Sequence, residues 1–389
     1  MRQLCTALLL LPILVSEVHA ADSRLHAAND WVYVLQPSGA ASVAQIAASG
    51  FDLAVIDYSS DGGPDGELTP AQVANLKASG KVVLAYLSIG EAETYRYYWQ
   101  PTWNDDPVPD PDAPSWLGPF NPSFPDNYKV RYWQPAWQAL LFGTATGPNR
   151  SYLDRIVDQG FDGIYLDIID AFTFWSDEQG ERSRLQARQD MVALVQALAG
   201  YARSTRGVSG FLIVPQNGDD IVLDDDGELD ALGQSYLATI DGIGVEDVFY
   251  DELTTQPPAE VTFRTETLTH YRHAGRRILS VDYVWNPSAP TGAANVDRFN
   301  DYQLRALTEG YIPYAAVRDR DLNEILTIAS GGGLVYCQPK QGTAGVFADG
   351  FETGSTGAWS GASGAGAAMR TSRLPSPRAA CGSSALPTR

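Results

Sequence analysis

The sequence predicts an α/β protein in which eight parallel strands alternate with helices as a (β/α)8 TIM barrel. Short apolar, β-branched or aromatic runs alternate with helical patterns from Trp31 to about Ile328. The runs are nearly continuous in apolar character, which is typical of parallel strands covered by helices. An open doubly wound sheet, the alternative, predicts a glycine-rich phosphate loop after the first strand, and none is present. The predicted strands are Trp31–Gln36, Leu53–Tyr58, Val82–Ile89, Gly163–Ile168, Phe211–Pro215, Gly242–Glu246, Ile278–Val284 and Tyr311–Val317.

The segments between the strands carry helix signals. Thr69-Pro70 opens one helix with proline at its first position, and Gly80 closes it before the next strand. Apolar residues in Ser183–Thr205 recur at helical spacing. The exception is Thr102–Asn127, rich in proline, aspartate and tryptophan, which is too long for an ordinary connector. We expect an irregular functional loop there.

The two ends of the chain differ from its centre. Residues 1–20 have a positive start, a short apolar run and a small-residue cleavage pattern, which predict a secretory signal peptide. A membrane anchor is the alternative, but the run is shorter than the ~20 residues of a span. Residues 21–335 form the predicted barrel, and residues 336–389 a tail rich in glycine, serine and alanine. We expect a secreted or periplasmic protein. Cys337 and Cys381 either pair as a disulfide or remain free thiols.

The 389 residues carry a formal net charge of −20. Such a charge disfavours nucleic acid and anionic lipid, and it favours a cationic polymer as a partner. The alternative is that the charge serves solubility only. We therefore expect a cationic polysaccharide as the substrate and partner, and no nucleic-acid or membrane partner. Separately from the charge, we expect a monomer.

Polar residues recur where the predicted strands end. At the C-terminal face of a β/α barrel such side chains converge on one pit. A single aspartate there could simply cap a helix, but recurrence on several strands favours a shared site. Clustered carboxylates raise the pKa of one member, and a protonated and an ionised carboxyl group together suit glycosidic cleavage. The candidate carboxylates and amide are Asp57, Glu91, Asp167, Asn217, Glu246 and Asp282, and the nearby aromatics include Tyr58, Tyr86, Tyr165 and Tyr283.

Other chemistries have little support in the sequence. His270 and His273 lie three apart on a predicted outer helix, without metal-site spacing. A Gly-x-Ser-x-Gly nucleophile motif is not found in the chain. We expect no metal and no cofactor.

Three motifs resemble one family. Val55-Ile56-Asp57-Tyr58, Ala85-Tyr86-Leu87-Ser88-Ile89-Gly90-Glu91-Ala92-Glu93 and Gly160-Phe161-Asp162-Gly163-Ile164-Tyr165-Leu166-Asp167 are similar to glycoside hydrolase family 114, the endo-α-1,4-polygalactosaminidases. The resemblance spans about Trp31 to Ile328. It implies endo-cleavage of α-1,4-linked galactosamine chains. The match is loose around Glu246 at the end of the sixth predicted strand, where the adjacent Asp247 is an alternative candidate for the general acid.

The resemblance also implies roles for residues. Asp167 is expected as the nucleophile and Glu246 as the general acid/base. The remaining candidates, Asp57, Tyr58, Tyr86, Glu91, Tyr165, Asn217, Asp282 and Tyr283, are expected to contact the substrate. Two alternatives stay open: a hydrolase of another α-linked glycan, and a barrel that binds polysaccharide without cleaving it.

Overall fold

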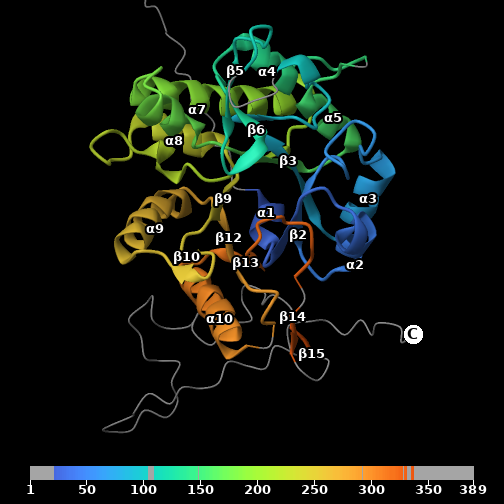
Figure 1. Ribbon diagram of the computed structural model, residues 1–389, viewed down its shortest axis with the longest axis vertical. Helices are drawn as coiled ribbons and strands as arrows, with labels where there is room; N and C mark the ends of the chain where they lie inside the picture. Colours follow the sequence, from blue (N-terminus) through green and yellow to red (C-terminus); the bar gives the residue numbers. More distant parts are fainter. Residues whose placement is uncertain are drawn as a thin grey trace, which may run out of the picture.

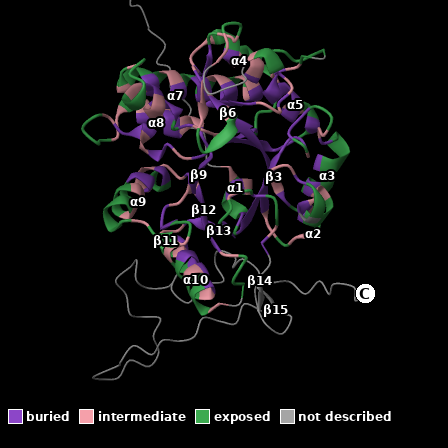
Figure 2. Cartoon of the chain, viewed as in Figure 1, coloured by how far each residue is buried: buried purple, intermediate pink, exposed green. Residues whose placement is uncertain are grey.

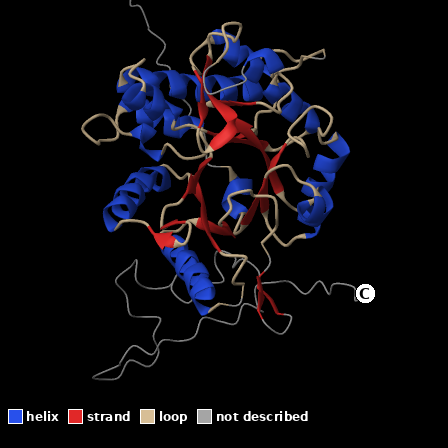
Figure 3. Ribbon diagram, viewed as in Figure 1, coloured by secondary structure: helices blue, strands red, loops and turns tan. Residues whose placement is uncertain are grey.

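The computed structural model describes residues 22–103, 109–147, 149–290, 292–326, 328–330 and 334–336. The predicted signal peptide, most of the tail and all three cysteines lie outside these residues. The eight predicted strands are all present and form a ring (Figure 3). Their bounds are β1 (Trp31–Val34), β2 (Leu53–Asp57), β3 (Val82–Ser88), β7 (Gly163–Asp167), β8 (Leu212–Pro215), β9 (Gly242–Glu246), β12 (Arg277–Trp285) and β13 (Ile312–Val317).

The strands form two parallel sheets, ordered β1-β2-β3-β7-β8 and β9-β12-β13. An isolated parallel bridge between Gln216 and Gly244 joins the sheets just beyond β8. On the other side, β1 contacts β13, where the Trp31 indole N–H donates to the Ile312 carbonyl at 2.8 Å. The parallel β/α architecture predicted from the sequence is therefore confirmed.

Helices surround the strands (Figure 1). The predicted start of α3 is confirmed, because Thr69 and Gln72 form a reciprocal capping box ahead of Pro70. In the described residues, no helix is both long and apolar enough to cross a bilayer. The helices longer than one turn are α1 (Ser23–Ala27), α2 (Val43–Ala48), α3 (Pro70–Ala78), α4 (Pro135–Leu141), α5 (Tyr152–Gln159), α7 (Arg184–Gly200), α8 (Ala231–Thr239), α9 (Pro258–His273) and α10 (Ala293–Thr308).

Aromatic side chains fill the interior of the ring, whose strands are buried (Figure 2). Trp31 stacks on Tyr33 at 5.8 Å between ring centroids, and Tyr33 meets the edge of Tyr165 at 5.3 Å. Tyr165 reaches across to β9, where a Cβ on Gly244 would lie 1.7 Å from its hydroxyl oxygen. Glycine at 244 therefore makes room for the aromatic layer beneath the strand ends.

The expectation of an irregular loop at Thr102–Asn127 is wrong for the last part of that segment, from Leu117 onward. It contains β5 (Leu117–Asn121) and most of β6 (Phe124–Val130), which form an antiparallel sheet with β4 (Glu91–Glu93) in the order β4-β6-β5. Proline and aspartate obscured the strand pattern, but Pro125 lies outside the stretch of β6 that pairs with β4. This inserted sheet lies beside the carboxyl ends of β3 and β7, where Val130 N–H donates to the Gly90 carbonyl.

Candidate active site

Asp167 and Glu246 are the last residues of β7 and β9. Side chains alternate along a strand, so Asp167 shares the inner face with Tyr165. Glu246 shares it with Gly244, which faces the Tyr165 hydroxyl. Both carboxylates therefore point into the end of the ring where parallel strands place catalytic groups.

Two donors hold the Asp167 carboxylate. The Tyr86 hydroxyl donates to Oδ2 at 2.7 Å, and the backbone N–H of Ile168 donates to Oδ1 at 2.8 Å. Burial, followed by the nearby negative charge of Glu246, raises the pKa of Asp167 well above its usual value. The Asp167 carboxyl group is thus close enough to Glu246 to be influenced by its negative charge.

Glu246 is held from two neighbouring strands. Asn217, just beyond β8, donates from Nδ2 to Glu246 Oε2 at 2.7 Å and accepts from the Glu246 backbone N–H at 2.9 Å. The Tyr283 hydroxyl on β12 donates to the other carboxylate oxygen, Oε1. Both oxygens of the carboxylate therefore have a fixed donor, which orients the group towards the pocket.

The backbone turns sharply just beyond these strand ends. Ile168, Asn217 and Asp247 have φ angles of 63°, 59° and 53°, in the left-handed region. For the β-branched Ile168 this conformation is strained. Such strain persists where the surrounding structure over-determines the backbone, and it concentrates at functional sites. Here it directs the Ile168 N–H back to Asp167.

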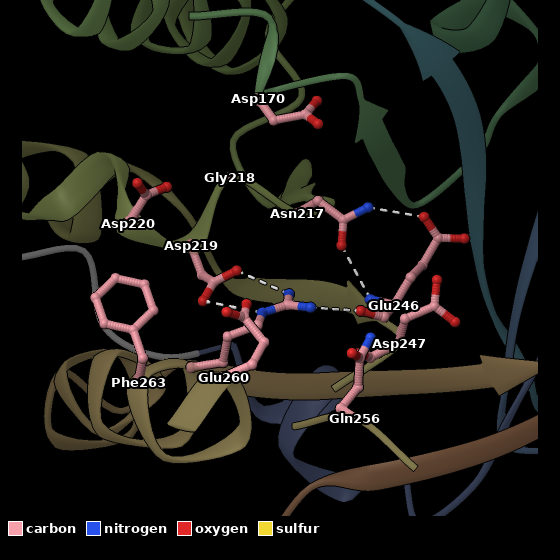
Figure 4. A pocket seen from close by; sticks show the side chains of 11 residues that line it. Asp170, Asn217, Gly218, Asp219, Asp220, Glu246, Asp247, Gln256, Glu260 and Phe263 are labelled. Carbon is pink, nitrogen blue, oxygen red and sulfur yellow. Dashed lines mark hydrogen bonds and ion pairs between the residues drawn. The ribbon is translucent and has the colours of Figure 1, made fainter. Parts of the chain in front are cut away.

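Glu246 lines an open pocket of about 370 Å³, a size suited to a small ligand (Figure 4). Six of the lining side chains are acidic. The only cation in the lining, Arg264, pairs with Asp219 at 2.8 Å and donates to the Glu246 carbonyl at 2.6 Å. The pocket therefore carries a net negative charge in its lining, although Asp219, Asp220 and Asp247 are each paired with an arginine. Its lining comprises Asp170, Asn217, Gly218, Asp219, Asp220, Glu246, Asp247, Gln256, Glu260, Phe263 and Arg264.

Asp170 and Asp247 differ in their partners. Asp247 forms an ion pair with Arg320 at 2.8 Å, so this competitor for the acid role is already bound by a cation. The exposed Asp170 carboxylate makes no side-chain hydrogen bond or ion pair with any other described residue, and it is one of the lining side chains drawn in Figure 4. Burial raises the pKa of Asp247 to about 6, although the Arg320 guanidinium opposes the shift.

The structure places Asp57 and Tyr58 away from the pocket. Asp57 is buried and pairs with Arg96 at 2.8 Å, and Arg96 also pairs with Glu93 at 2.5 Å. Burial raises the pKa of Asp57 to about 6, although the guanidinium opposes the shift. Tyr58 faces outward and packs on Tyr152 of α5, with ring centroids 4.8 Å apart. Asp57 and Tyr58 therefore have structural contacts at the end of β2.

Glu91 and Asp282 are also enclosed. Glu91 is fully buried and binds the Lys129 ammonium at 2.5 Å and the Asn121 amide at 3.0 Å, which joins β4 to β6 and β5 within the inserted sheet. Asp282 accepts three backbone N–H bonds from residues 248–250, and burial raises its pKa to about 7. Its carboxylate anchors the turn after β9. Of the predicted residues, Asp167, Glu246, Tyr86, Asn217 and Tyr283 therefore lie together, with Tyr165 beneath them.

The sequence analysis missed most of the pocket lining. Three missed acidic residues follow the candidates Asp167 and Asn217 by two or three positions: Asp170, Asp219 and Asp220. Their closeness to these strand ends could have indicated that they line the same site. Phe263 and Arg264 lie on α9, and nothing in the sequence indicates that this helix faces the pocket. Within the part of the chain that the structure describes, no group of three or more His, Cys, Asp or Glu side chains is arranged to hold a metal ion.

A β/α ring with two donor-held carboxylates at its strand ends is compatible with glycosidic cleavage. The model of glycoside-hydrolase family GH114 matches residues 15–338. The chain belongs to this family, and its membership classes it as a glycoside hydrolase.

Two sequence relatives match this chain over most of their length, and one solved structure resembles its fold. An uncharacterized protein of Thermotoga maritima is 40% identical over 300 residues, which cover 77% of this chain and 84% of that protein. An uncharacterized protein of Methanocaldococcus jannaschii is 38% identical over 297 residues, or 76% of this chain and 78% of that protein. The solved glycoside hydrolase domain of a PelA variant from Pseudomonas aeruginosa is 18% identical with a TM-score of 0.52, covering 78% of this chain and all of that domain. This last likeness concerns the fold.

Proposed function

We propose that this protein is an endo-acting hydrolase of α-1,4-linked, galactosamine-containing polysaccharide, with Asp167 and Glu246 as its catalytic pair. The observation that carries the proposal is a pair of donor-held carboxylates beside a pocket with six acidic side chains. The family motifs around Tyr86 and Asp167 support the galactosamine substrate. The N-terminal sequence supports export to where such polymers occur.

The pair divides the chemistry of glycosidic cleavage. Glu246 protonates the departing glycosidic oxygen, and Asp167 attacks the anomeric carbon or stabilises its positive charge. Water then adds to the anomeric carbon and gives its proton to Glu246, which releases the sugar and restores both carboxyl groups. The Tyr86 hydroxyl and the Ile168 N–H stabilise the ionised form of Asp167. Burial opposes that form by raising the pKa of Asp167. A cationic sugar in the adjacent pocket lowers the pKa again, so substrate binding favours the ionised nucleophile.

The acidic pocket distinguishes an amino sugar from its acetylated form. Galactosamine carries an ammonium group near neutral pH, whereas the acetamido group is neutral. Asp170 is the carboxylate best placed to accept this ammonium, because no side chain of the described residues forms a hydrogen bond or ion pair with it. Lys129 acts on it only through its nearby charge. Arg264 does not oppose the ammonium strongly, since Asp219 already pairs with it.

Product analysis tests this proposal. Purified protein is incubated with deacetylated and with fully N-acetylated α-1,4-galactosamine polymer, and mass spectrometry detects the released oligosaccharides. We expect a ladder of oligosaccharides from the deacetylated polymer, at a rate that falls as added salt screens the pocket. The Glu246→Gln protein is the control. Release from the acetylated polymer alone would contradict the charge-based specificity, and release only from another α-glycan would overturn the substrate.

A further inference from the structure

A second pocket lies between the inserted sheet and the segment that follows β7. The sheet contributes Phe120, Asn121 and Lys129, and the segment containing α6 (Ala171–Thr173) and η3 (Phe174–Glu178) contributes Asp170, Phe174 and Glu178. Asp170 also lines the acidic pocket beside Glu246. The two pockets therefore share a wall residue and lie next to one another at the carboxyl ends of the strands.

We propose that this second pocket is a subsite for a further pyranose unit of the polysaccharide whose cleavage is proposed above. Phe120 and Phe174 are only partly buried and offer apolar ring surface to the C–H face of a sugar. Lys129 and Glu178 supply a hydrogen-bond donor and an acceptor for hydroxyl groups. A few polar groups beside apolar surface are typical of small-ligand sites.

The charges of the second pocket suit the same amino-sugar chain. Its only cation, Lys129, already pairs with the buried Glu91 at 2.5 Å. The Asp170 and Glu178 carboxylates outnumber this ammonium in the lining. The pocket therefore does not repel an ammonium-bearing sugar, and one polymer can extend from the acidic pocket past Asp170 into it.

The walls of the subsite are held in place before any ligand arrives. The Trp175 indole N–H donates to the Val130 carbonyl at 2.7 Å, joining η3 to β6. Arg131 pairs with Glu181 at 2.7 Å across the same boundary. The Lys129 ammonium lies 5.2 Å from the Phe174 ring centroid. Because these contacts already fix both walls, a bound sugar loses less free energy to ordering the protein.

The test compares Phe120→Ala with Phe124→Ala. Phe124 is on the same sheet and 51% exposed but does not line the pocket, so it is the matched control. We expect Phe120→Ala to lower kcat/KM on long polymer about tenfold and to change the product lengths, while cleavage of the shortest cleavable oligomers stays at the wild-type rate. Phe124→Ala should match wild type in each assay.

A binding measurement keeps this test independent of turnover. Calorimetry on Glu246→Gln protein, with and without Phe120→Ala, compares long and short galactosamine oligomers. We expect Phe120→Ala to weaken only the binding of long oligomers. Equal effects of Phe120→Ala and Phe124→Ala, or a loss independent of oligomer length, would overturn the subsite. If the wild-type protein does not hydrolyse the polymer but binding still depends on oligomer length, the proposed reaction is wrong and the proposed subsite is still supported.

Discussion

Asn217 holds Glu246 at both its backbone and its side chain, so Asn217→Ala tests whether positioning of this carboxylate limits the reaction. The variant loses the 2.7 Å bond to Oε2 and the 2.9 Å bond from the Glu246 N–H. A hydrogen bond to a charged group contributes about 1.5–3 kcal/mol and a neutral one about 0.5–1.5 kcal/mol. Loss of about 3 kcal/mol from the transition state lowers kcat/KM about 100-fold.

Backbone strain must be separated from this side-chain effect. Asn217 has φ 59°, which alanine tolerates less well than asparagine, whereas glycine adopts it freely. Asn217→Gly is therefore the matched variant. We expect both variants to lose activity alike, while the thermal midpoint falls more for alanine than for glycine.

Steady-state kinetics on deacetylated polymer, combined with a double-mutant cycle, completes the test. In a Glu246→Gln background, Asn217→Ala should cost little further activity, because the two residues act as a unit. Activity of Asn217→Ala within about fivefold of wild type would refute the reasoning. Fully additive losses would mean that Asn217 acts without Glu246.

Three further outcomes follow from single features. Asp170→Asn should reduce the preference for deacetylated over acetylated polymer about fivefold, the effect of one exposed ion pair; an unchanged preference would exclude Asp170 from ammonium recognition. Gly244→Ala should lower the free energy of unfolding by about 1–3 kcal/mol through its clash with Tyr165, whereas Gly200→Ala, which meets nothing within 4 Å, should not. Asp57 and Asp282 have folded pKa values of about 6 and 7, above the unfolded value of 3.8, so the folded state holds their protons more tightly. The free energy of unfolding that these protonated groups contribute is fully present below about pH 4 and is lost as the pH rises through 6 and 7. For Asp282 the loss is on the order of 4 kcal/mol. A thermal midpoint higher at pH 8 than at pH 5 would contradict this expectation.

The strands were predictable because each forms a short, nearly continuous apolar run that parallel packing requires. Both β9 bounds and the starts of β2, β3 and β7 agree with the sequence prediction. The inserted sheet was not predictable by the same signal. Only one pair of its strands is regular, and β5 pairs with β6 through register shifts that break the alternation.

The sequence analysis proposed neighbouring residues at the same strand end as site residues, and the structure separates some of these neighbours. Neighbouring residues on a strand face opposite sides, so Asp282 and Tyr283 cannot both point into the ring. Tyr283 contacts Glu246, while Asp282 on the outer face binds the turn after β9. Alternation does not explain Asp57, which pairs in register with the inward-facing Tyr86 but binds Arg96, a residue that also lies over the Tyr58 ring. Applying the two-residue period to β12 would have distinguished the inward Tyr283 from the outward Asp282.

The central claim is that Asp167 and Glu246 perform the cleavage together. We would measure kcat on deacetylated α-1,4-galactosamine polymer for Asp167→Asn and Glu246→Gln, with circular dichroism and thermal midpoints to establish that each variant folds. We expect each to fold as wild type does and to lose about 1,000-fold or more of kcat. A folded variant that retains activity within about tenfold of wild type would contradict the assignment of that residue to the catalytic pair.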